Sequence, residues 1–298
     1  MNRRVAVQLK GGLGNQLFQY ALGRRLSLQL EAELLFDCSV LENRIPVTNF
    51  TFRSFDLDMF RIAGRVATPS DLPLFPKSAS IRSPWPHLVQ LARLWKQGYS
   101  YVYERGFAYN PKMLRQLSDR VYLNGYWQSY RYFEDIAATL RADCSFPDPL
   151  PDSAVGLAGQ INATNSICLH IRRTDFLQVP LHQVSNADYV GRAIAYMAER
   201  VNDPHFFVFS DDIAWCQTNL RLSYPVVFVP NELAGPKNSL HFRLMRYCKH
   251  FITANSTFSW WAAWLSEPSD GKVIVTPQTW FSDSRSIDDL IPANWIRL

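Results

Sequence analysis

A short apolar run that meets a glycine-rich turn and then a helical pattern is the feature that most constrains this chain. The run covers residues 4–9, the turn is Gly11-Gly12-Leu13-Gly14, and the helical pattern after it extends to Leu30. Residues 33–37 are typical of a second strand. Strand, glycine turn, helix and strand form one crossover unit of a parallel sheet, so the first half of the chain is predicted to be α/β.

The second half alternates strands and helices more regularly, which predicts a doubly wound parallel sheet. The first half adds a predicted strand at 121–127 and an amphipathic helix at 130–142. In the second half we predict strands at 166–171, 206–209, 226–229, 251–253 and 273–275, and helices at 187–201, 213–220, 240–248 and 258–265.

The chain has 298 residues, which is enough for two domains that each bury a core. Residues 146–152, Phe-Pro-Asp-Pro-Leu-Pro-Asp, are the densest proline cluster and mark the predicted domain boundary. We therefore expect one domain at 1–150 and a second at 151–298. Between residues 43 and 100, scattered prolines predict loops and short helices that cover one edge of the first sheet.

Composition limits the possible partners. The formal net charge of +5 is compatible with an anionic small molecule or lipid, but the basic residues are scattered, which argues against nucleic acid. Five cysteines without a C-x-x-C pair suggest neither a zinc ribbon nor a disulfide framework, and they favour a reducing cytoplasm. No apolar stretch is long enough for a bilayer span, so we expect a soluble protein, with peripheral membrane association left open.

A cluster of basic residues follows the predicted strand at 166–171. It reads His170-Ile171-Arg172-Arg173-Thr174-Asp175, and ligands of open parallel sheets bind outside the carboxyl ends of strands. Two buried arginines are costly unless an anion or carboxylates meet them, and guanidinium groups match phosphate oxygens, so a nucleotide diphosphate is favoured. The alternative is that one arginine pairs with Asp175 and the other is solvated, while His170 is a core histidine.

Two more polar clusters follow predicted strands. In Ser210-Asp211-Asp212, one aspartate is expected to cap the next helix, which leaves the other for a hydroxyl or a base. In residues 255–259, Asn-Ser-Thr-Phe-Ser, hydroxyls and free N–H groups at the start of an apolar helix would form a phosphate cradle. Trp260 and Trp264 lie four residues apart on that helix and are expected in the core.

The glycine turn and one acidic pair allow other interpretations. Gly12 and Gly14 fit the G-x-G-x-x-G pattern of dinucleotide-binding proteins, but Leu17 occupies the third glycine, so a tight structural turn is an alternative. Asp56-Leu57-Asp58 has the D-x-D spacing that can hold a divalent cation on a diphosphate, but it lies far from the regular sheet, where a solvated loop is favoured. Cys/His metal spacing is absent, and we predict no bound metal.

Four segments together resemble the family-11 glycosyltransferases, the α-1,2-fucosyltransferases. They are Gly-Gly-Leu-Gly-Asn-Gln-Leu-Phe-Gln-Tyr-Ala (11–21), Asn-Gly-Tyr-Trp-Gln-Ser (124–129), His-Ile-Arg-Arg-Thr-Asp (170–175) and Asn-Ser-Thr-Phe-Ser-Trp-Trp (255–261), in the right order across nearly the whole chain. The third segment also resembles α-1,6-fucosyltransferases and protein O-fucosyltransferases. The resemblance implies an α/β fold with two Rossmann-like domains facing a cleft, the B-type glycosyltransferase fold.

The resemblance also implies the chemistry. It implies GDP-fucose as the donor co-substrate, no other cofactor, no metal, and inversion at the fucose anomeric carbon. The acceptor would be the 2-hydroxyl of a β-galactoside, bound by the first domain while the second binds the nucleotide sugar. Soluble relatives of this kind suggest O-antigen synthesis in the bacterial cytoplasm, with attachment to the inner membrane surface left open. A carbohydrate-binding module without catalysis and an NAD(P)-dependent oxidoreductase are the alternatives.

Carried over position by position, the resemblance implies that Arg172 stabilises the β-phosphate as GDP leaves, while Arg173 supports that loop or shares the charge. Asp211 is taken as the aspartate that does not cap the helix. The donor-binding residues are then Asn15, His170, Asp175, Asp211, Ser256, Thr257 and Phe258.

The acceptor side is less constrained. The rings of Tyr126 and Trp127 are expected to hold the galactoside, with inert packing as the alternative. The general base stays unassigned, with Asp175 and Asp37 as candidates. His241 stands where the family usually carries an acidic residue, which leaves any ribose or base contact there unassigned.

Overall fold

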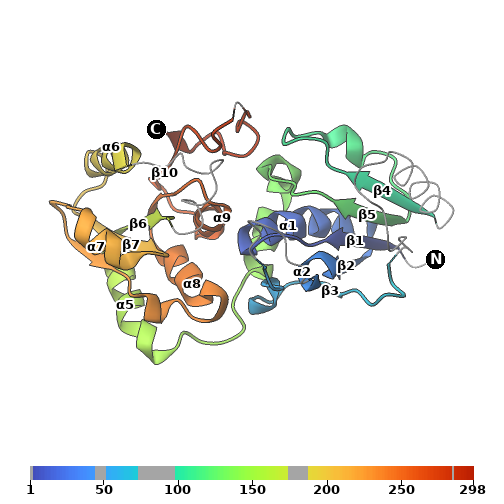
Figure 1. Ribbon diagram of the computed structural model, residues 1–298, viewed down its shortest axis with the longest axis horizontal. Coiled ribbons are helices and arrows are strands. Elements are labelled where there is room, and N and C mark those ends of the chain that lie inside the picture. The colour runs from blue at the N-terminus through green and yellow to red at the C-terminus, as the bar shows by residue number, and fades with distance from the viewer. Residues whose placement is uncertain (1–2, 44–51, 73–97, 174–186, 284) are drawn as a thin grey trace. The chain divides into compact units, whose positions relative to one another are not determined.

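The computed structural model describes residues 3–43, 52–72, 98–173, 187–283 and 285–298. It divides into two compact units, Met1–Asp143 and Cys144–Leu298, drawn in Figure 1. Each unit contains one parallel sheet. The predicted α/β class with two Rossmann-like units is therefore confirmed.

The sheet of the first unit has five parallel strands in the order β3-β2-β1-β5-β4. The strands are β1 (Arg4–Gln8), β2 (Glu33–Asp37), β3 (Arg65–Val66), β4 (Tyr99–Tyr103) and β5 (Arg120–Asn124). The helices are α1 (Leu13–Leu30), α2 (Ser39–Glu42) and α4 (Ala137–Asp143), with short 3-10 helices η1 (Leu57–Met59), η2 (Pro111–Leu114), η3 (Tyr130–Tyr132) and η4 (Glu134–Ile136).

Helix α1 packs closely against one face of this sheet, because Gly23 has no side chain at the point of contact. A Cβ atom at Gly23 would lie 2.5 Å from Val7 Cγ2 and 3.0 Å from Leu34 Cδ1. Side chains alternate along a strand, so the neighbouring residues Ala6 and Leu35 point to the opposite face, where they form a buried cluster with Tyr122. Both faces of the sheet therefore carry apolar contacts, as expected for parallel strands.

The sheet of the second unit has six parallel strands in the order β11-β10-β9-β6-β7-β8. The strands are β6 (Asn165–Ile171), β7 (Pro204–Ser210), β8 (Val226–Phe228), β9 (His250–Ile252), β10 (Ile274–Thr276) and β11 (Ile296–Arg297). The helices are α5 (Asp152–Ala163), α6 (Ala187–Ala198), α7 (Ile213–Asn219), α8 (Ser239–Tyr247) and α9 (Thr257–Leu265), with 3-10 helices η7 (Asn231–Leu233) and η8 (Pro236–Asn238).

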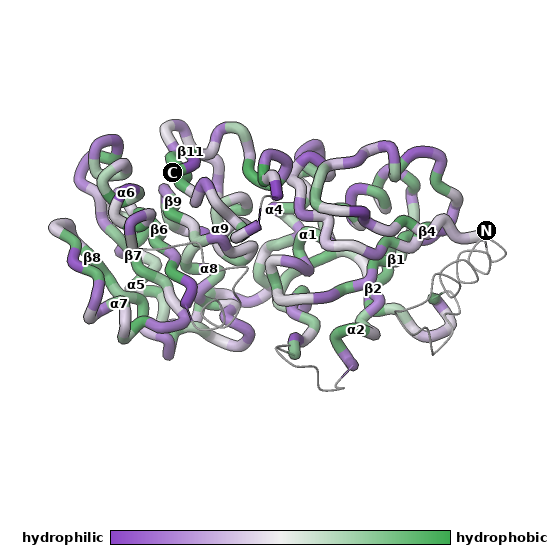
Figure 2. The backbone as a smooth tube through the Cα atoms, turned by 45° about the horizontal axis from the view of Figure 1, so that its top comes forward, coloured by the Kyte–Doolittle hydropathy of each residue, from purple (hydrophilic) through white to green (hydrophobic). Residues whose placement is uncertain are grey.

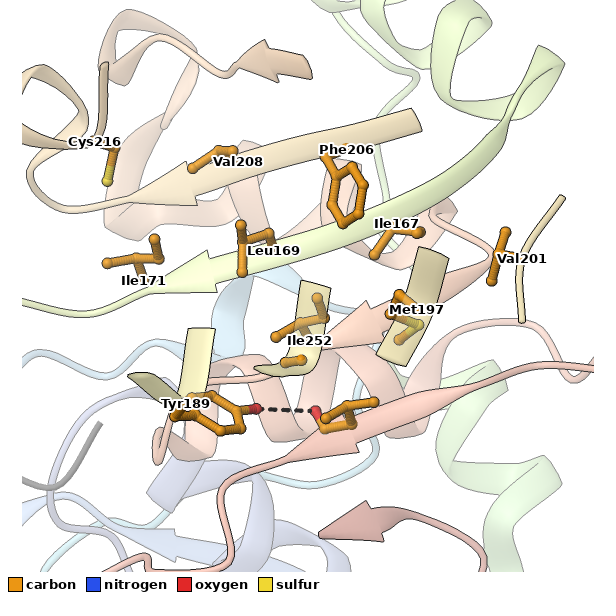
Figure 3. Close-up of a cluster of buried hydrophobic side chains, with 12 residues drawn as sticks. Ile167, Leu169, Ile171, Tyr189, Met197, Val201, Phe206, Val208, Cys216 and Ile252 are labelled. Carbon is orange, nitrogen blue, oxygen red and sulfur yellow. Dashed lines mark hydrogen bonds between the residues drawn. The ribbon is translucent and has the colours of Figure 1, made fainter. Parts of the chain in front are cut away.

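Alternation along β6 separates the two faces of the second sheet. Ile167, Leu169 and Ile171 join a buried cluster with Tyr189 and Met197 of α6, shown in Figure 3. The residues between them point the other way, toward α8 and α9, where the ring of His170 lies 5.9 Å from that of Phe258. Figure 2 shows hydrophobic residues concentrated along the central strands and the helices that cover them.

Each sheet has a topological switch point, where the chain turns from one half of the sheet to the other. In the first unit this point lies between β1 and β5, and in the second it lies between β6 and β9. Ligands of open α/β sheets bind in the crevice outside the carboxyl ends of the strands at such points. The residues that follow β1, β5, β6 and β9 are therefore the first candidates for a site.

The structure differs from the predicted elements at several places, three of which lie between residues 121 and 163. The strand predicted to reach residue 127 ends at Asn124, because Trp127 has a left-handed backbone with φ of 57°. The helix predicted at 130–142 is split into η3, η4 and α4. Helix α5 was not predicted, because its start at Asp152 lies inside the proline cluster taken as a linker.

Residues 144–150, which the sequence assigned to the first domain, belong to the second unit. Arg246 Nη1 donates to the Cys144 carbonyl at 2.5 Å, and Arg243 Nη1 donates to the Asp148 carbonyl at 2.9 Å. The guanidinium of Arg243 also lies 5.1 Å from the centre of the Phe146 ring. Helix α8 therefore holds this segment. Among the residues that the structure describes, none of the helices has the length and hydropathy of a membrane span.

Candidate functional site

Two arginines follow β6 directly at the carboxyl edge of the second sheet, beside its switch point. Arg172 Nε lies 3.3 Å from Asp211 Oδ2, and Arg173 Nε lies 3.3 Å from Asp212 Oδ2. Strand β7 pairs with β6 in a register that places Ser210 opposite Ile171, so the two aspartates follow the neighbouring strand at the same level. The parallel register therefore aligns two cations with two carboxylates.

This pairing fulfils one of the two conditions expected for the arginines, because carboxylates rather than an outside anion meet them. Their side chains are 23% and 24% exposed, and each has a carboxylate of the same unit beside it. The predicted alternative partner, Asp175, lies outside the described residues. Each arginine therefore has a counterion within its own unit.

Arg173 contacts both the cap and the first turn of α7. Its guanidinium lies 3.6 Å from the centre of the Trp215 ring, and its partner Asp212 caps α7 by accepting a hydrogen bond from the Trp215 amide at 3.2 Å. The predicted capping aspartate is therefore confirmed as Asp212. The other aspartate, Asp211, was expected to be left for a ligand. It instead pairs with Arg172 and accepts a hydrogen bond from the Arg173 amide at 2.9 Å.

His170, at the end of β6, is buried and uncharged. It is 6% exposed, and its Nδ1 atom has no hydrogen-bond partner within the described part of the chain. Burial, and secondarily the nearby charge of Arg172, lowers the pKa of His170 to about 3. A neutral imidazole with an unsatisfied nitrogen is a group that a ligand can satisfy, but it adds no positive charge to the site.

The start of α9 lies across the switch point from the arginines. It follows β9, which pairs with β6 so that Ile252 lies opposite Leu169. Ser256 is the N-cap residue, and its side chain forms no capping hydrogen bond. Thr257 and Phe258 are partly buried in the first turn. Three predicted donor-binding residues thus lie at the positive end of a nine-residue helix, where anions are stabilised.

Neighbouring residues of α9 are structural. Asn255 Nδ2 donates to the Trp280 carbonyl at 3.0 Å. Trp260 is fully buried, as predicted, donates from its indole nitrogen to the Leu290 carbonyl at 3.1 Å, and stacks on the partly buried Trp264.

His241, which departs from the family pattern, packs inside the second unit. Its Nε2 lies 3.0 Å from the Pro230 carbonyl, and its ring meets that of Phe209 edge-on at 5.5 Å. The side chain is 5% exposed, and burial lowers its pKa. These contacts give His241 a packing role on α8.

The glycine turn of the first unit is held by buried amides of α1. Gln16 is fully buried and donates to the carbonyls of Gly11 and Ser54, both at 2.8 Å. Gln19 is also fully buried, accepts from the Lys10 amide at 3.1 Å, and donates to the Gly125 carbonyl at 3.2 Å. The glutamines of the Gly-Asn-Gln-Leu-Phe-Gln motif therefore join loops that are distant in the sequence.

Asn15 joins the same two loops. Its Oδ1 accepts from Gln128 Nε2 at 2.8 Å, and a Cβ atom at Gly11 would lie 2.4 Å from its Nδ2. Gly11 has φ of 79°, so a glycine is favoured there for both backbone conformation and space. A donor-binding role for Asn15 stays a prediction, and its structural role is to position the turn.

The two rings predicted to bind the acceptor differ in accessibility. Trp127 is fully buried and meets Tyr132 edge-on at 5.9 Å, so the expectation that its ring holds a sugar is wrong. The indole also packs against Gly125, where an added Cβ atom would lie 2.7 Å from it. Tyr126 is partly exposed and stays a candidate.

Two charged residues that were not predicted from the sequence lie at the carboxyl edge of the first sheet. Lys10 follows β1, and its Nζ donates to Asn124 Oδ1 at 3.1 Å and lies 4.7 Å from the centre of the Tyr126 ring. Glu104 follows β4 and accepts from the amides of Tyr126 at 2.6 Å and Trp127 at 2.9 Å. The signal that could have found them is a charged residue within two positions of the end of each of these strands.

Burial perturbs both charged groups. Desolvation lowers the pKa of Lys10, and the negative charge of Glu104 opposes that shift. Desolvation also raises the pKa of Glu104, against the two amide hydrogen bonds and the charge of Lys10. Perturbed titratable groups at a sheet edge are candidates for a functional site.

Two acidic candidates are structural. Asp37 is 2% exposed, and it accepts from the Tyr122 hydroxyl at 2.5 Å and the Ser39 amide at 2.9 Å, so it is not placed to act as a general base. Asp56 is buried and accepts from the Ser54 hydroxyl at 2.7 Å, while Asp58 lies in η1, so the D-x-D pair is not on a strand. The described residues contain no group of three or more His, Cys, Asp or Glu side chains that could hold a metal ion.

Comparison with known proteins identifies relatives along the whole chain. The family model described as Glycosyl transferase family 11 matches residues 4–298. An Escherichia coli protein named alpha-1,2-colitosyltransferase is 30% identical over 300 residues, covering 99% of this chain and 98% of its own. The Escherichia coli O-antigen biosynthesis glycosyltransferase WbnK is 31% identical, covering 97% of this chain and 99% of its own.

More distant similarities are consistent with these. Rat galactoside alpha-(1,2)-fucosyltransferase 1 is 27% identical, covering 86% of this chain and 62% of its own. Among solved structures, NodZ alpha-1,6-fucosyltransferase soaked with GDP-fucose superposes with a TM-score of 0.52 at 15% identity, covering 89% of this chain and 93% of its own. The structural likeness shows a shared fold.

Proposed function

Because the chain belongs to glycosyl transferase family 11, we propose that it transfers fucose from GDP-fucose to the 2-hydroxyl of a β-galactoside, with inversion at C1. Family membership favours a transferase over a carbohydrate-binding module or an NAD(P)-dependent oxidoreductase. The galactoside and O-antigen names of the relatives support this acceptor class and a role in O-antigen synthesis. The donor acts as a co-substrate, with no further cofactor and no metal.

The observation that carries the proposal is the charge arrangement at the switch point of the second sheet. Arg172 follows β6 on one side, and the uncapped start of α9 follows β9 on the other. A guanidinium and a helix N-terminus are the two protein groups best suited to a diphosphate. The neutral His170 beside them offers Nδ1 to an uncharged part of the nucleotide.

The reaction asks these groups to stabilise a leaving group. The oxygen of the acceptor hydroxyl forms a bond to fucose C1 and gives up its proton to a general base, while the bond from C1 to the β-phosphate oxygen breaks and its electron pair leaves with GDP. Negative charge then grows on the β-phosphate, where Arg172 and the α9 dipole act without reorganising. Asp211 holds Arg172 in place before the donor binds and shares it afterwards.

A second donor sugar has a specific observation in its favour. The relative at 30% identity over nearly the whole chain is named a colitosyltransferase, whereas the mammalian relatives are named fucosyltransferases. Colitose is therefore the second candidate, on the same arginine edge and with the same reaction.

The test is to incubate the purified protein with GDP-fucose or GDP-colitose and a panel of β-galactosides, with and without a chelator. We expect an α-1,2-linked product from GDP-fucose, identified by mass and by NMR of the anomeric proton, that the chelator does not reduce. If only GDP-colitose gives a product, colitose would replace fucose as the proposed donor sugar. Product that disappears with the chelator would overturn the metal-free mechanism, and tighter binding of NADH than of GDP would favour the oxidoreductase.

A further inference from the structure

We propose that Lys10 and Glu104 form a subsite for the hydroxyl groups of a neutral sugar, with Lys10 determining acceptor specificity. This inference rests on the proposed function, because it names the residues that read the acceptor. It concerns the carboxyl edge of the first sheet, whereas Arg172, Arg173 and their aspartate partners follow strands of the second sheet.

The position of the pair is the first argument. Lys10 follows β1 and Glu104 follows β4, with β5 between these strands in the sheet. Both residues therefore lie at the carboxyl edge, and β1 borders the switch point, where α/β sheets bind ligands. Gln19 fixes the backbone of Lys10 through both its amide and its carbonyl, at 3.1 and 3.2 Å. These two hydrogen bonds fix the backbone from which the Lys10 side chain extends.

The hydrogen-bonding capacity of the pair is the second argument. An ammonium has three N–H donors, and within the described residues Lys10 Nζ uses one of them, on Asn124 at 3.1 Å. A carboxylate has about four acceptor sites, and Glu104 receives one amide on each oxygen. Donors remain on Lys10 and acceptor sites remain on Glu104.

The charge of the pair selects the ligand. A sugar hydroxyl both accepts and donates hydrogen bonds, so the hydroxyls of one sugar can accept from Lys10 and donate to Glu104. An anion would meet the carboxylate as well as the ammonium, and a cation would meet the ammonium as well. Both residues are partly buried, and a hydrogen bond to a partly desolvated charge is stronger than one in water. The subsite therefore favours a neutral, hydroxyl-rich ligand.

The neighbouring rings complete the subsite. Tyr126, partly exposed, lies against the Lys10 ammonium, and the Tyr101 hydroxyl accepts from Asn124 Nδ2 at 2.9 Å. Tyr101 in turn stacks on the buried Tyr122 at 5.7 Å. This aromatic support fixes Asn124, and through it the direction of the ammonium.

The test is a double-mutant cycle in which one change is made in the protein and the other in the acceptor sugar. The wild type and Lys10→Met are assayed with GDP-fucose against methyl β-D-galactoside and its 3-, 4- and 6-deoxy analogues. In the wild type, loss of the hydroxyl bound by Lys10 should lower kcat/KM about 10- to 100-fold, as expected for one hydrogen bond to a charged group. In Lys10→Met, the same deoxygenation should cost nothing further, while the KM for GDP-fucose stays unchanged.

Controls separate this role from a structural one. Lys112→Met removes an exposed lysine of the same unit and should keep the wild-type response to every deoxy sugar. Lys10→Gln keeps a donor for Asn124, and it replaces Lys10→Met if that variant has a lowered melting temperature. Equal losses in the wild type and the Lys10 variant for every analogue would overturn the inference. A wild type that transfers fucose to no galactoside would instead contradict the proposed function.

Discussion

The two sheets place different chemistry at the same position. At the edge of the second sheet, two arginines each lie 3.3 Å from an aspartate, and the uncapped start of α9 follows the adjacent strand. At the edge of the first sheet, Lys10 and Glu104 are surrounded by amides and tyrosines, and Lys10 donates a hydrogen bond to Asn124. Both edges follow from parallel strands with a switch point.

The difference teaches how one sheet topology can serve two ligands. Guanidinium groups and a helix N-terminus match a diphosphate, which carries localised negative charge. Amides, hydroxyls and one balanced charge pair match a neutral sugar, which offers many weak donors and acceptors. We therefore propose that the nucleotide binds to the second unit and the acceptor to the first, and the predictions below test that proposal.

The largest expected effect concerns Arg172. Arg172→Ala should lower kcat on the order of a hundredfold or more at saturating donor, because a preorganised donor to the leaving phosphate is lost. Arg173→Ala should lower kcat less, because Arg173 is stacked on Trp215 and paired with the cap of α7. Steady-state kinetics of both variants measure this, and near-normal turnover in Arg172→Ala would break the comparison.

The next effect concerns the buried amides that build the first edge. Gln19→Ala should lower the free energy of unfolding by about 2–4 kcal/mol, because it leaves a cavity and removes the partners of Lys10 and the Gly125 carbonyl. Gln29→Ala, on the exposed face of the same helix, should change it by less than about 0.5 kcal/mol. Urea unfolding measures both, and equal effects would show that Gln19 does not hold this edge.

A third prediction uses the pH dependence of the second edge. His170 has a folded-state pKa of about 3, below its ordinary value of 6.5, so its contribution to stability is complete above pH 6.5 and is lost as pH falls toward 3. Between pH 7 and pH 5 this group should account for up to about 2 kcal/mol of lost stability.

His170→Phe removes that titration, so its stability should fall less between pH 7 and pH 5 than that of the wild type. Urea unfolding at the two pH values measures the difference within each protein, which cancels the baseline effect of the substitution. An unchanged pH dependence would mean that His170 is not held neutral at this edge.

The smallest effect concerns the cap of α7. Asp212→Ala should destabilise the protein by about 1 kcal/mol, because the Trp215 amide loses its acceptor and Arg173 loses its carboxylate. Asp212→Asn keeps a capping oxygen and removes the charge, so it should cost less and isolate the ion pair. Thermal unfolding of the two variants would refute the capping role if the order were reversed.

The fold was predictable because hydrophobic periodicity and glycine turns act locally. Strand β2 was predicted at its observed bounds, and the regular alternation of the second half yielded the elements from β6 to β10 to within a few residues. Helix α5 was missed because Asp152 begins a helix directly after Pro151, at the end of a segment whose prolines suggested a linker. Strand β4 was missed because the region before it was read as irregular.

The site was predictable only where it lies within one segment. Arg172, Arg173 and the residues at the start of α9 were named because they follow apolar strands. Their ion pairs with Asp211 and Asp212 depend on the register of β6 and β7, which spacing in one chain does not define. Glu104 was missed and Trp127 was misjudged for a similar reason. The hydrogen bonds to Glu104 and the burial of Trp127 arise from contacts between β4 and the loop after β5.

The most direct measurement of the division between the two edges is calorimetric titration of GDP into the wild type, Arg172→Ala and Lys10→Met. We predict that Arg172→Ala weakens GDP binding at least about tenfold, as expected for the loss of a charge-assisted hydrogen bond, and that Lys10→Met leaves the Kd unchanged. Weakened binding in Lys10→Met together with a wild-type Kd in Arg172→Ala would place the nucleotide on the first unit and contradict the assignment.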